Sequence, residues 1–258
     1  MAKVDILGVQ IDNLSLQEVL ENIKQFLNSR NQHFIVTPNP EFLVAANKDQ
    51  NFKQILNYAD IAVADGIGLI KAAKFLGKRL QRVTGVDLVW AISELAAEKK
   101  YPIYFLGADE MIAAQTAEFL KQEFNKLKIA GAESGGEIIN PQTPDQDLIK
   151  RIQEARPKIL FVAFGQVKQE KWIFANLDKF PSVKLAVGVG GAFDYISGEV
   201  SRAPKFLRQA GLEWLWRLIQ QPARWRRIIN AVIIFPLLIL FRKYFPEKMP
   251  ENTNEDTE

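Results

Sequence analysis

Polar residues and glycines follow several short apolar runs of this sequence, at the points where strands are expected to end. These residues are Thr37 and Asn39, Asp65 and Gly66, Gly107, and the segment Gly165 to Gln169. In a parallel α/β sheet, the carboxyl ends of the strands form the edge at which ligands bind. Each residue also has an ordinary interpretation, since Asp65 could cap a helix and Thr37 and Asn39 could make a turn. Their joint placement at one predicted edge favours a binding site there.

A glycine-rich turn followed by a strongly basic stretch forms a second group of candidates. Val183 to Val187 is a run typical of a core strand, and the three glycines between 188 and 191 allow its backbone to approach a ligand closely. From Arg202 to Lys243 the chain carries nine Lys or Arg and one acid, Glu213, whereas residues 1–201 carry 23 basic and 24 acidic residues. The basic segment is therefore expected to bind anions.

Strand-like runs alternate with helical segments through residues 1–201, and this alternation predicts a doubly wound, mostly parallel, Rossmann-like α/β sheet. The expected strands are Val4–Val9, Phe34–Thr37, Ile61–Ala64, Ile103–Leu106, Leu127–Ala130, Ile159–Phe164 and Val183–Val187. The expected helices are a capping-box helix from Ser15 and Glu18 through Leu27, and Pro40–Asn47, Gly66–Leu76, Val86–Lys99, Met111–Phe124, Asp145–Ala155 and Gln169–Leu177.

Three parts are expected along the chain: an α/β core over 1–201, a basic amphipathic helical appendage over 202–245, and a disordered tail over 246–258. The N-terminus lacks the apolar region of a signal peptide, so the core is expected in the cytoplasm. The apolar run over 228–241 contains Pro236 and is shorter than the roughly 20 residues of a spanning helix. We expect it to lie in the membrane interface.

Composition limits the possible chemistry. The sequence has 258 residues, 48% of them hydrophobic and 24% charged, which suits one globular core with an accessory piece. With no cysteine and a single histidine, His33, the chain offers neither thiolate chemistry nor a multi-histidine metal site. The glycine-rich segment 188–193 lacks the third glycine of a dinucleotide fingerprint and follows the last strand, which disfavours a nicotinamide site.

Several motifs, matched in order, resemble the WecG/TagA/CpsF family of bacterial glycosyltransferases over about residues 3–230. They are Thr37-Pro38-Asn39, Ala64 to Gly68, Gln81 to Leu88, Gly165 to Trp172, Gly188 to Gly198, Arg202-Ala203-Pro204 and Gly211 to Trp214. Two positions depart from the family pattern. Val167 stands where the family usually has proline, which suggests a less rigid loop, and Gln221 stands before Pro222 where the family often has Glu.

The resemblance implies transfer of a sugar, often N-acetylmannosamine or its uronic acid, from a UDP donor to a sugar linked to polyprenyl diphosphate. A sugar hydroxyl is a weak nucleophile, so a carboxylate must accept its proton, and Asp65 is the expected general base. Arg217, Arg224 and Arg227 match the basic positions of the family's C-terminal segment, and guanidinium groups suit a diphosphate. Arg226 is expected to point elsewhere, towards lipid phosphate.

The remaining site residues implied by the resemblance would line the substrate pocket around Asp65. They are Thr37, Asn39, Gly66, Arg82, Gly165, Gln169, Gly190 and Asp194. Arg82 could instead pair with Asp87 or another surface acid. The basic residues of the appendage could equally form a solvated face, and its tryptophans could pack on the core.

The sequence therefore predicts an inverting glycosyltransferase, without metal or cofactor, on the cytoplasmic face of a bacterial membrane. Its expected partners are a UDP-sugar, a polyprenyl-diphosphate-linked N-acetylglucosamine and an anionic membrane surface, in cell-wall teichoic acid or surface polysaccharide synthesis. Nucleic acid is not expected, because it would leave the apolar run over 228–241 unexplained. Which UDP-sugar is used and whether the chain forms a homo-oligomer are left open.

Two alternatives remain at this stage. Asp145 and Asp147 have the spacing of a metal-dependent transferase, although acids in the first turn of a helix are also favoured by its dipole. The second alternative is a non-catalytic nucleotide-binding module tethered to anionic lipid.

Overall fold

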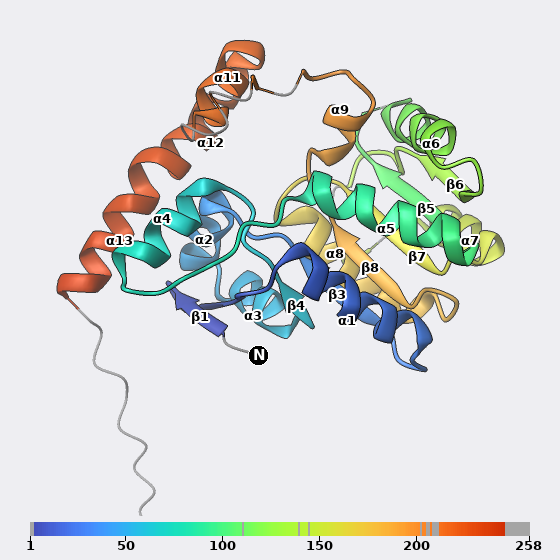
Figure 1. Cartoon of the computed structure of the whole chain (residues 1–258), viewed down its shortest axis with the longest axis horizontal. Helices are drawn as coiled ribbons and strands as arrows, with labels where there is room; N and C mark the ends of the chain where they lie inside the picture. The colour runs from blue at the N-terminus through green and yellow to red at the C-terminus, as the bar shows by residue number, and fades with distance from the viewer. Residues whose placement is uncertain are drawn as a thin grey trace, which may run out of the picture.

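A six-stranded parallel sheet lies at the centre of the protein, and helices cover both of its faces (Figure 1). The computed structural model describes residues 3–109, 111–138, 140–143, 145–201, 203–204, 207 and 212–245. The strand order is β4-β3-β8-β7-β5-β6, and all neighbouring strands are parallel. The strands are β3 (His33–Val36), β4 (Ile61–Ala62), β5 (Pro102–Gly107), β6 (Lys128–Glu133), β7 (Ile159–Ala163) and β8 (Leu185–Gly188). The predicted doubly wound parallel sheet is confirmed.

Side chains alternate between the two faces of the sheet and divide the core into two layers. In β3, Phe34 and Val36 join one buried cluster and Ile35 joins the other, as the two-residue period of a strand requires. The Phe34 layer is closed by α2 (Pro40–Lys48), α3 (Gln50–Tyr58), α4 (Ile67–Phe75), α7 (Gln146–Ala155) and α8 (Lys168–Asn176). The Ile35 layer is closed by α1 (Leu16–Asn28), α5 (Gly85–Lys99), α6 (Ile112–Glu123) and α9 (Ala192–Ile196).

The N-terminal prediction of one strand over Val4–Val9 is wrong. The chain instead forms an antiparallel hairpin of β1 (Lys3–Ile6) and β2 (Val9–Asp12), a separate two-stranded sheet that packs beside β4 through Asp12. Leu7 and Gly8 turn the chain, with φ angles of 56° and 82°. Positive φ at both turn positions matches the twist of a tight hairpin, so the apolar alternation continues through the turn and hides it.

The first helix follows its sequence signal closely. Ser15 Oγ accepts a hydrogen bond from the backbone N of Glu18 (3.2 Å), and Glu18 Oε2 accepts one from the backbone N of Ser15 (2.8 Å). The predicted capping box is therefore confirmed, and it fixes where α1 begins.

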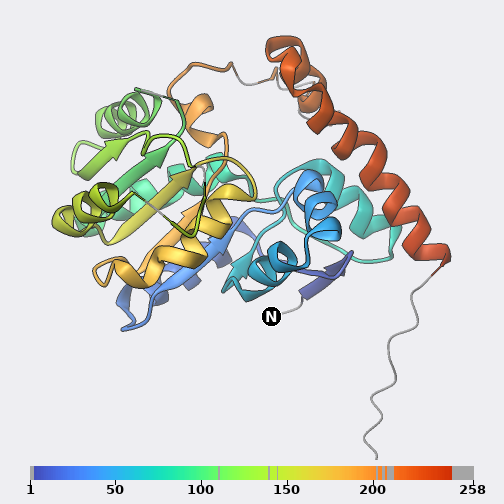
Figure 2. The same cartoon turned by 180° about the vertical axis from the view of Figure 1, so that it is seen from behind.

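The C-terminal segment forms a band of helices that runs along one side of the core, beside α4 and α2 (Figures 1 and 2). It comprises α11 (Glu213–Gln220), the 3₁₀ turn η2 (Pro222–Arg224), α12 (Trp225–Ile229), the π-helical turn η3 (Asn230–Ile234) and α13 (Phe235–Tyr244). Pro222 begins a new turn after α11, a position that suits proline because the first residue of a helical turn needs no N–H donor. The π turn precedes Pro236, where proline removes a helix hydrogen bond donor.

One face of α13 is part of the core. Phe235 and Ile239, one turn apart, are buried in the same cluster as the side chains of α2. The opposite face exposes the large apolar side chains of Leu237 and Phe241, and Ile233 of the preceding turn η3 is exposed as well. Among the described residues, no helix combines the length and apolar character needed to cross a membrane.

Candidate active site

A cavity of about 520 Å³ lies at the carboxyl edge of the sheet, between the strand ends and the C-terminal helices. Because parallel strands all end at this edge, it gathers loops that are far apart in the sequence. Its wall includes these predicted site residues: Thr37, Asn39, Asp65, Gly165, Gly190, Asp194, Arg217, Arg224 and Arg227. Gly66, Arg82 and Gln169 lie outside the described part of the wall.

Asp65 stands just beyond β4, on the cavity wall. Its Oδ2 accepts a hydrogen bond from the backbone N of Gly85 (3.2 Å), at the start of α5. It does not cap the helix that follows it, because the N-cap of α4 is Gly66, which adopts a φ of 106°. Such an angle is easily reached only by glycine. Gly66 therefore shapes the turn that presents the Asp65 carboxylate at the edge of the sheet.

Thr37 and Asn39 follow β3 and make local structural contacts. Thr37 is buried, and its Oγ1 donates to the carbonyl O of Gly188 (3.0 Å), which ties β3 to the end of β8. Asn39 caps α2, since its Oδ1 accepts from the backbone N of Glu41 (2.9 Å) and of Phe42 (3.2 Å). Their expected contacts with substrate remain predictions.

Gln169 lies directly behind the cavity wall rather than in it. The side chain is fully buried, and its Oε1 accepts a hydrogen bond from the backbone N of Gly190 (3.0 Å). Its Nε2 donates to Oε1 of Glu170 (2.6 Å). Gln169 is thus placed to support the glycine-rich turn. Arg82 lies at an isolated parallel bridge with Ala64, close in sequence to the start of α5.

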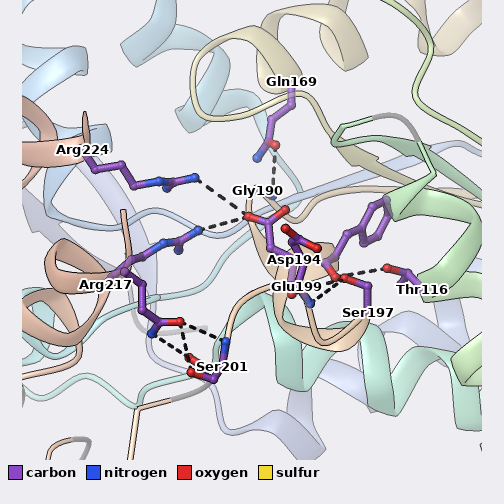
Figure 3. Close-up of polar contacts among 11 residues, drawn as sticks. Thr116, Gln169, Gly190, Asp194, Ser197, Glu199, Ser201, Arg217 and Arg224 are labelled. Carbon is purple, nitrogen blue, oxygen red and sulfur yellow. Dashed lines mark hydrogen bonds and ion pairs between the residues drawn. The ribbon is translucent and has the colours of Figure 1, made fainter. Parts of the chain in front are cut away.

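Three arginines from the C-terminal helices meet carboxylates of the core at the cavity. Arg217 Nη2 lies 3.3 Å from Asp194 Oδ2, and Arg224 Nη2 lies 3.9 Å from the same oxygen (Figure 3). Arg227 Nε donates to Glu41 Oε2 (2.7 Å). The predicted basic positions therefore converge on the cavity, whereas Arg226 is exposed and lies over the ring of Trp225.

The charges of this cluster are only partly balanced. Burial, together with the neighbouring Arg217 and Arg227, lowers the pKa of Arg224 to about 10, and the carboxylates of Asp194 and Glu41 oppose this decrease. Burial raises the pKa of Asp194, and its two arginine partners oppose that rise. A cation whose pKa is lowered by other cations gains from a nearby anion. The three arginines therefore favour an anionic ligand at this side of the cavity.

Several wall residues were not predicted from the sequence. They are chiefly the charged side chains Glu41, Asp109, Glu137, Lys168 and Glu199. Glu41 is two residues from Asn39 in the first turn of α2, where an acid has an ordinary role near the helix dipole. Lys168 lies within the strand-end segment Gly165 to Gln169 and Asp109 lies two residues after Gly107, but neither was selected as a site residue. Glu137 and Glu199 lie in loops with no strand-end motif, so only the fold brings them to the cavity.

The structure gives Asp145 and Asp147 the ordinary helical role. Asp145 is the N-cap of α7 and accepts from the backbone N of Asp147 (3.0 Å), and both residues are exposed. Neither lines the described wall of the cavity. Within the described residues, no group of three His, Cys, Asp or Glu side chains is arranged to hold a metal ion.

Comparison with known proteins agrees with this geometry. One relative, "N-acetylglucosaminyldiphosphoundecaprenol N-acetyl-beta-D-mannosaminyltransferase" from Bacillus spizizenii, is 38% identical over 206 residues, which is 80% of this chain and 78% of the relative. A protein of the same name from Staphylococcus aureus is 34% identical over 239 residues, 91% of each chain. The model of the glycosyl transferase WecG/TagA/CpsF family matches residues 4–249. With a family match over most of its length, the chain belongs to the WecG/TagA/CpsF family of glycosyltransferases.

Proposed function

We propose that this protein is an inverting hexosyltransferase that moves N-acetylmannosamine from a UDP-linked donor to N-acetylglucosamine carried on a polyprenyl diphosphate. The names of the relatives from Bacillus spizizenii and Staphylococcus aureus support the sugar and the lipid-linked acceptor. Such a product would serve teichoic acid or surface polysaccharide synthesis. The β linkage in those names is what inversion gives when the donor sugar is α-linked.

The observation that carries this proposal is that the carboxylate of Asp65 and the guanidinium groups of three arginines line the same cavity. Asp65 lines the wall at the end of β4, and Arg217, Arg224 and Arg227 line it from the C-terminal helices. A transferase needs a base for the attacking hydroxyl and positive charge for the departing diphosphate. The cavity holds both kinds of group.

In the proposed reaction, Asp65 accepts the proton of the acceptor hydroxyl as its oxygen bonds to the anomeric carbon of the donor. The bond from that carbon to the diphosphate oxygen breaks, and UDP leaves with the electron pair. Arg217, Arg224 and Arg227 stabilise the charge that develops on the diphosphate. Thr37, Asn39, Arg82, Gln169 and Asp194 shape the pocket around the two sugars.

The exposed face of the C-terminal helices supports membrane binding in addition. Trp225, Ile233, Leu237 and Phe241 are exposed, and basic residues flank this apolar surface at both ends. An apolar helix face with flanking cations is typical of a helix that lies in the headgroup region of an anionic membrane. We place this surface on the inner face of the plasma membrane, where a nucleotide-sugar donor is available.

Release of UDP tests the proposed function. The full chain is mixed with UDP-N-acetylmannosamine and a short-chain polyprenyl-diphosphate N-acetylglucosamine, and free UDP and the lipid disaccharide are measured. Acceptor-dependent release of UDP with formation of the disaccharide supports the transferase. Binding of UDP without release would favour the alternative of a non-catalytic module.

A further inference from the structure

We propose that Glu170 is a positioning residue: its buried carboxyl group orients the amide of Gln169, which in turn holds the glycine-rich turn at Gly190 in the cavity wall. Glu170 lies behind the cavity wall and contacts Gln169, but it does not contact Asp65 or the three arginines that take part in the proposed reaction. The inference rests on the proposed function only for the measurement of turnover, and the measurement of hydrogen exchange is independent of it.

Each oxygen of the Glu170 carboxyl group accepts a hydrogen bond from a different donor. The side chain of Glu170 is fully buried, its Oε2 accepts from the backbone N of Val167 (2.7 Å), and its Oε1 accepts from Nε2 of Gln169 (2.6 Å). A carboxyl group presents an acceptor at each oxygen, whereas an amide presents an acceptor at one end and donors at the other. A glutamate at position 170 can therefore accept from both donors at once, whereas a glutamine of the same length cannot.

The amide of Gln169 has only one orientation compatible with this arrangement. With Nε2 turned to Glu170, its Oε1 faces the backbone N of Gly190 and accepts its hydrogen bond (3.0 Å). A flipped amide would place its NH₂ group against the N–H of Gly190 and its oxygen against an oxygen of Glu170. The contact of the NH₂ group with the N–H of Gly190 would be repulsive and would leave the N–H of Gly190 unsatisfied.

The turn that Gln169 holds determines where the charged cluster sits. Gly190 has a φ of 54° and lines the cavity. A Cβ atom added to the next residue, Gly191, would lie 2.5 Å from Arg217 Nη2 and 3.1 Å from Asp194 Oδ2. The backbone of this turn is therefore in direct contact with the cluster, and a shift of the turn would move the cluster (Figure 3).

The other end of the turn is held separately. Thr37 donates to the carbonyl O of Gly188 (3.0 Å). A Cβ atom at Gly188 would lie 2.9 Å from Glu170 Oε1 and 3.0 Å from Gln169 Nε2, so the two side chains also pack tightly on this backbone. The segment from Gly188 to Gly190 is thus fixed at one end by Thr37 and at the other by the Glu170–Gln169 pair.

Glu170 also stabilises the backbone of the loop at Val167. The φ of 70° at Val167 is one that a β-branched residue rarely adopts, and the N–H of Val167 donates to Glu170. Proline, which the family usually has at this position, could neither donate that hydrogen bond nor adopt a positive φ. The carboxyl group of Glu170 therefore also stabilises a loop conformation that the Val167 substitution permits.

A swap of the two side chains tests the proposal. Glu170→Gln keeps size and shape but forces one donor against another, either at Val167 or at Gln169. In the double variant Gln169→Glu with Glu170→Gln, the new carboxylate accepts from Gly190 N and from the new amide, whose oxygen accepts from Val167 N. All three donors are satisfied again, so the double variant is the matched control for the single one.

Two measurements on the full chain separate the outcomes. Hydrogen exchange of the Gly190 amide is expected to speed up in Glu170→Gln and to return towards the parent rate in the double variant. Turnover is expected to fall by about tenfold to a hundredfold in the single variant, the scale of a misplaced site, and to recover at least partly in the double variant. If Glu170→Gln fails to fold but the double variant folds, this result would also support the pairing of Glu170 with Gln169.

The proposal is overturned if the Gly190 amide of Glu170→Gln exchanges as slowly as in the parent and turnover is also unchanged. It is also overturned if the double variant shows the same amide exchange and the same turnover as the single variant. Absence of any UDP release from the parent chain would contradict the proposed function instead. The exchange of the Gly190 amide would then still decide the role of Glu170.

Discussion

The carboxylate of Asp194, on α9 of the core, lies 3.3 Å from the guanidinium Nη2 of Arg217, on α11 of the C-terminal helices. Arg224 approaches the same carboxylate, and Arg227 pairs with Glu41 on α2. Two carboxylates of the core thus hold three cations of the C-terminal helices over one cavity. The cavity is completed only when these helices are in place.

Replacement of each cavity arginine tests this arrangement. Arg217→Ala, Arg224→Ala and Arg227→Ala are each expected to lower turnover with a water-soluble acceptor by about tenfold or more, because each removes charge that stabilises the departing diphosphate. UDP release measures the effect. Arg226→Ala is the matched control, since Arg226 is exposed on α12 beside Arg227 and lies outside the described cavity wall. Full activity of all three cavity variants on the soluble acceptor would mean that the helices only anchor the protein.

The apolar face of α13 leads to a separate prediction about membranes. Leu237→Ser with Phe241→Ser is expected to weaken binding to anionic vesicles by about tenfold or more, because burying each large apolar side chain is worth roughly 1.5–3 kcal/mol. Vesicle co-sedimentation measures binding, and turnover on the soluble acceptor should stay near the parent value. Tyr58→Ser, at an exposed aromatic residue of α3, is the control. Equal binding of the double variant and the parent would contradict a membrane role for this face.

A truncation after Ser201 is a less clean test than these point variants. Phe235 and Ile239 are buried against the core, so removal of the C-terminal helices uncovers apolar surface as well as removing charge. Loss of activity in the truncated chain would therefore combine two causes.

Stability should depend on pH through Glu170. Burial raises the pKa of Glu170 from 4.5 to about 8 in the folded chain. Between these values the folded state binds more protons than the unfolded state, so the contribution of Glu170 to stability is largest below pH 4.5 and is lost as the pH rises to about 8. The difference in melting temperature between the parent and Glu170→Gln should therefore be smaller at about pH 8.5 than at about pH 5. Thermal melts of both proteins at these two pH values measure it. A constant difference would contradict the assignment.

Removal of divalent metal should leave the activity intact. Asp145→Ala with Asp147→Ala is expected to cost roughly 0.5–2 kcal/mol for the lost helix cap and 0.3–1 kcal/mol for the lost dipole interaction, with turnover unchanged. Turnover in EDTA and thermal melts measure the two effects. Activity that disappears in EDTA and returns with magnesium or manganese would support the metal-dependent alternative.

The sequence carried much of the fold because its signals were local. Runs such as Ile159–Ala163 are buried throughout and end at glycine or polar residues, so the parallel sheet and its ligand-binding edge could be predicted. The hairpin at Leu7 and Gly8 was missed because its turn does not interrupt the apolar pattern. The edge strand β6 extends to Glu133, whereas the predicted strand ended at Ala130. The prediction was too short because the half-buried residues of β6 form no continuous apolar run.

The site was harder to predict because its decisive contacts are long-range. Arg227 and Glu41 are 186 residues apart, and no local pattern links them. Gln169 matched a family motif, but only the fold reveals that its amide faces Gly190 from behind the wall. Asp65 and the arginines were selected because they match motifs of the family, whereas their meeting at one cavity depends on how the C-terminal helices pack against α2.

The most direct test of the account is Asp65→Asn. The amide has nearly the same shape as the carboxylate but cannot accept the proton of the acceptor hydroxyl. Fold and UDP binding should therefore be preserved, as measured by thermal melts and isothermal titration calorimetry. Turnover, measured as UDP release with the lipid acceptor, should fall by roughly a hundredfold or more, the scale of a lost general base. Turnover equal to that of the parent chain would contradict the central claim that Asp65 is the base.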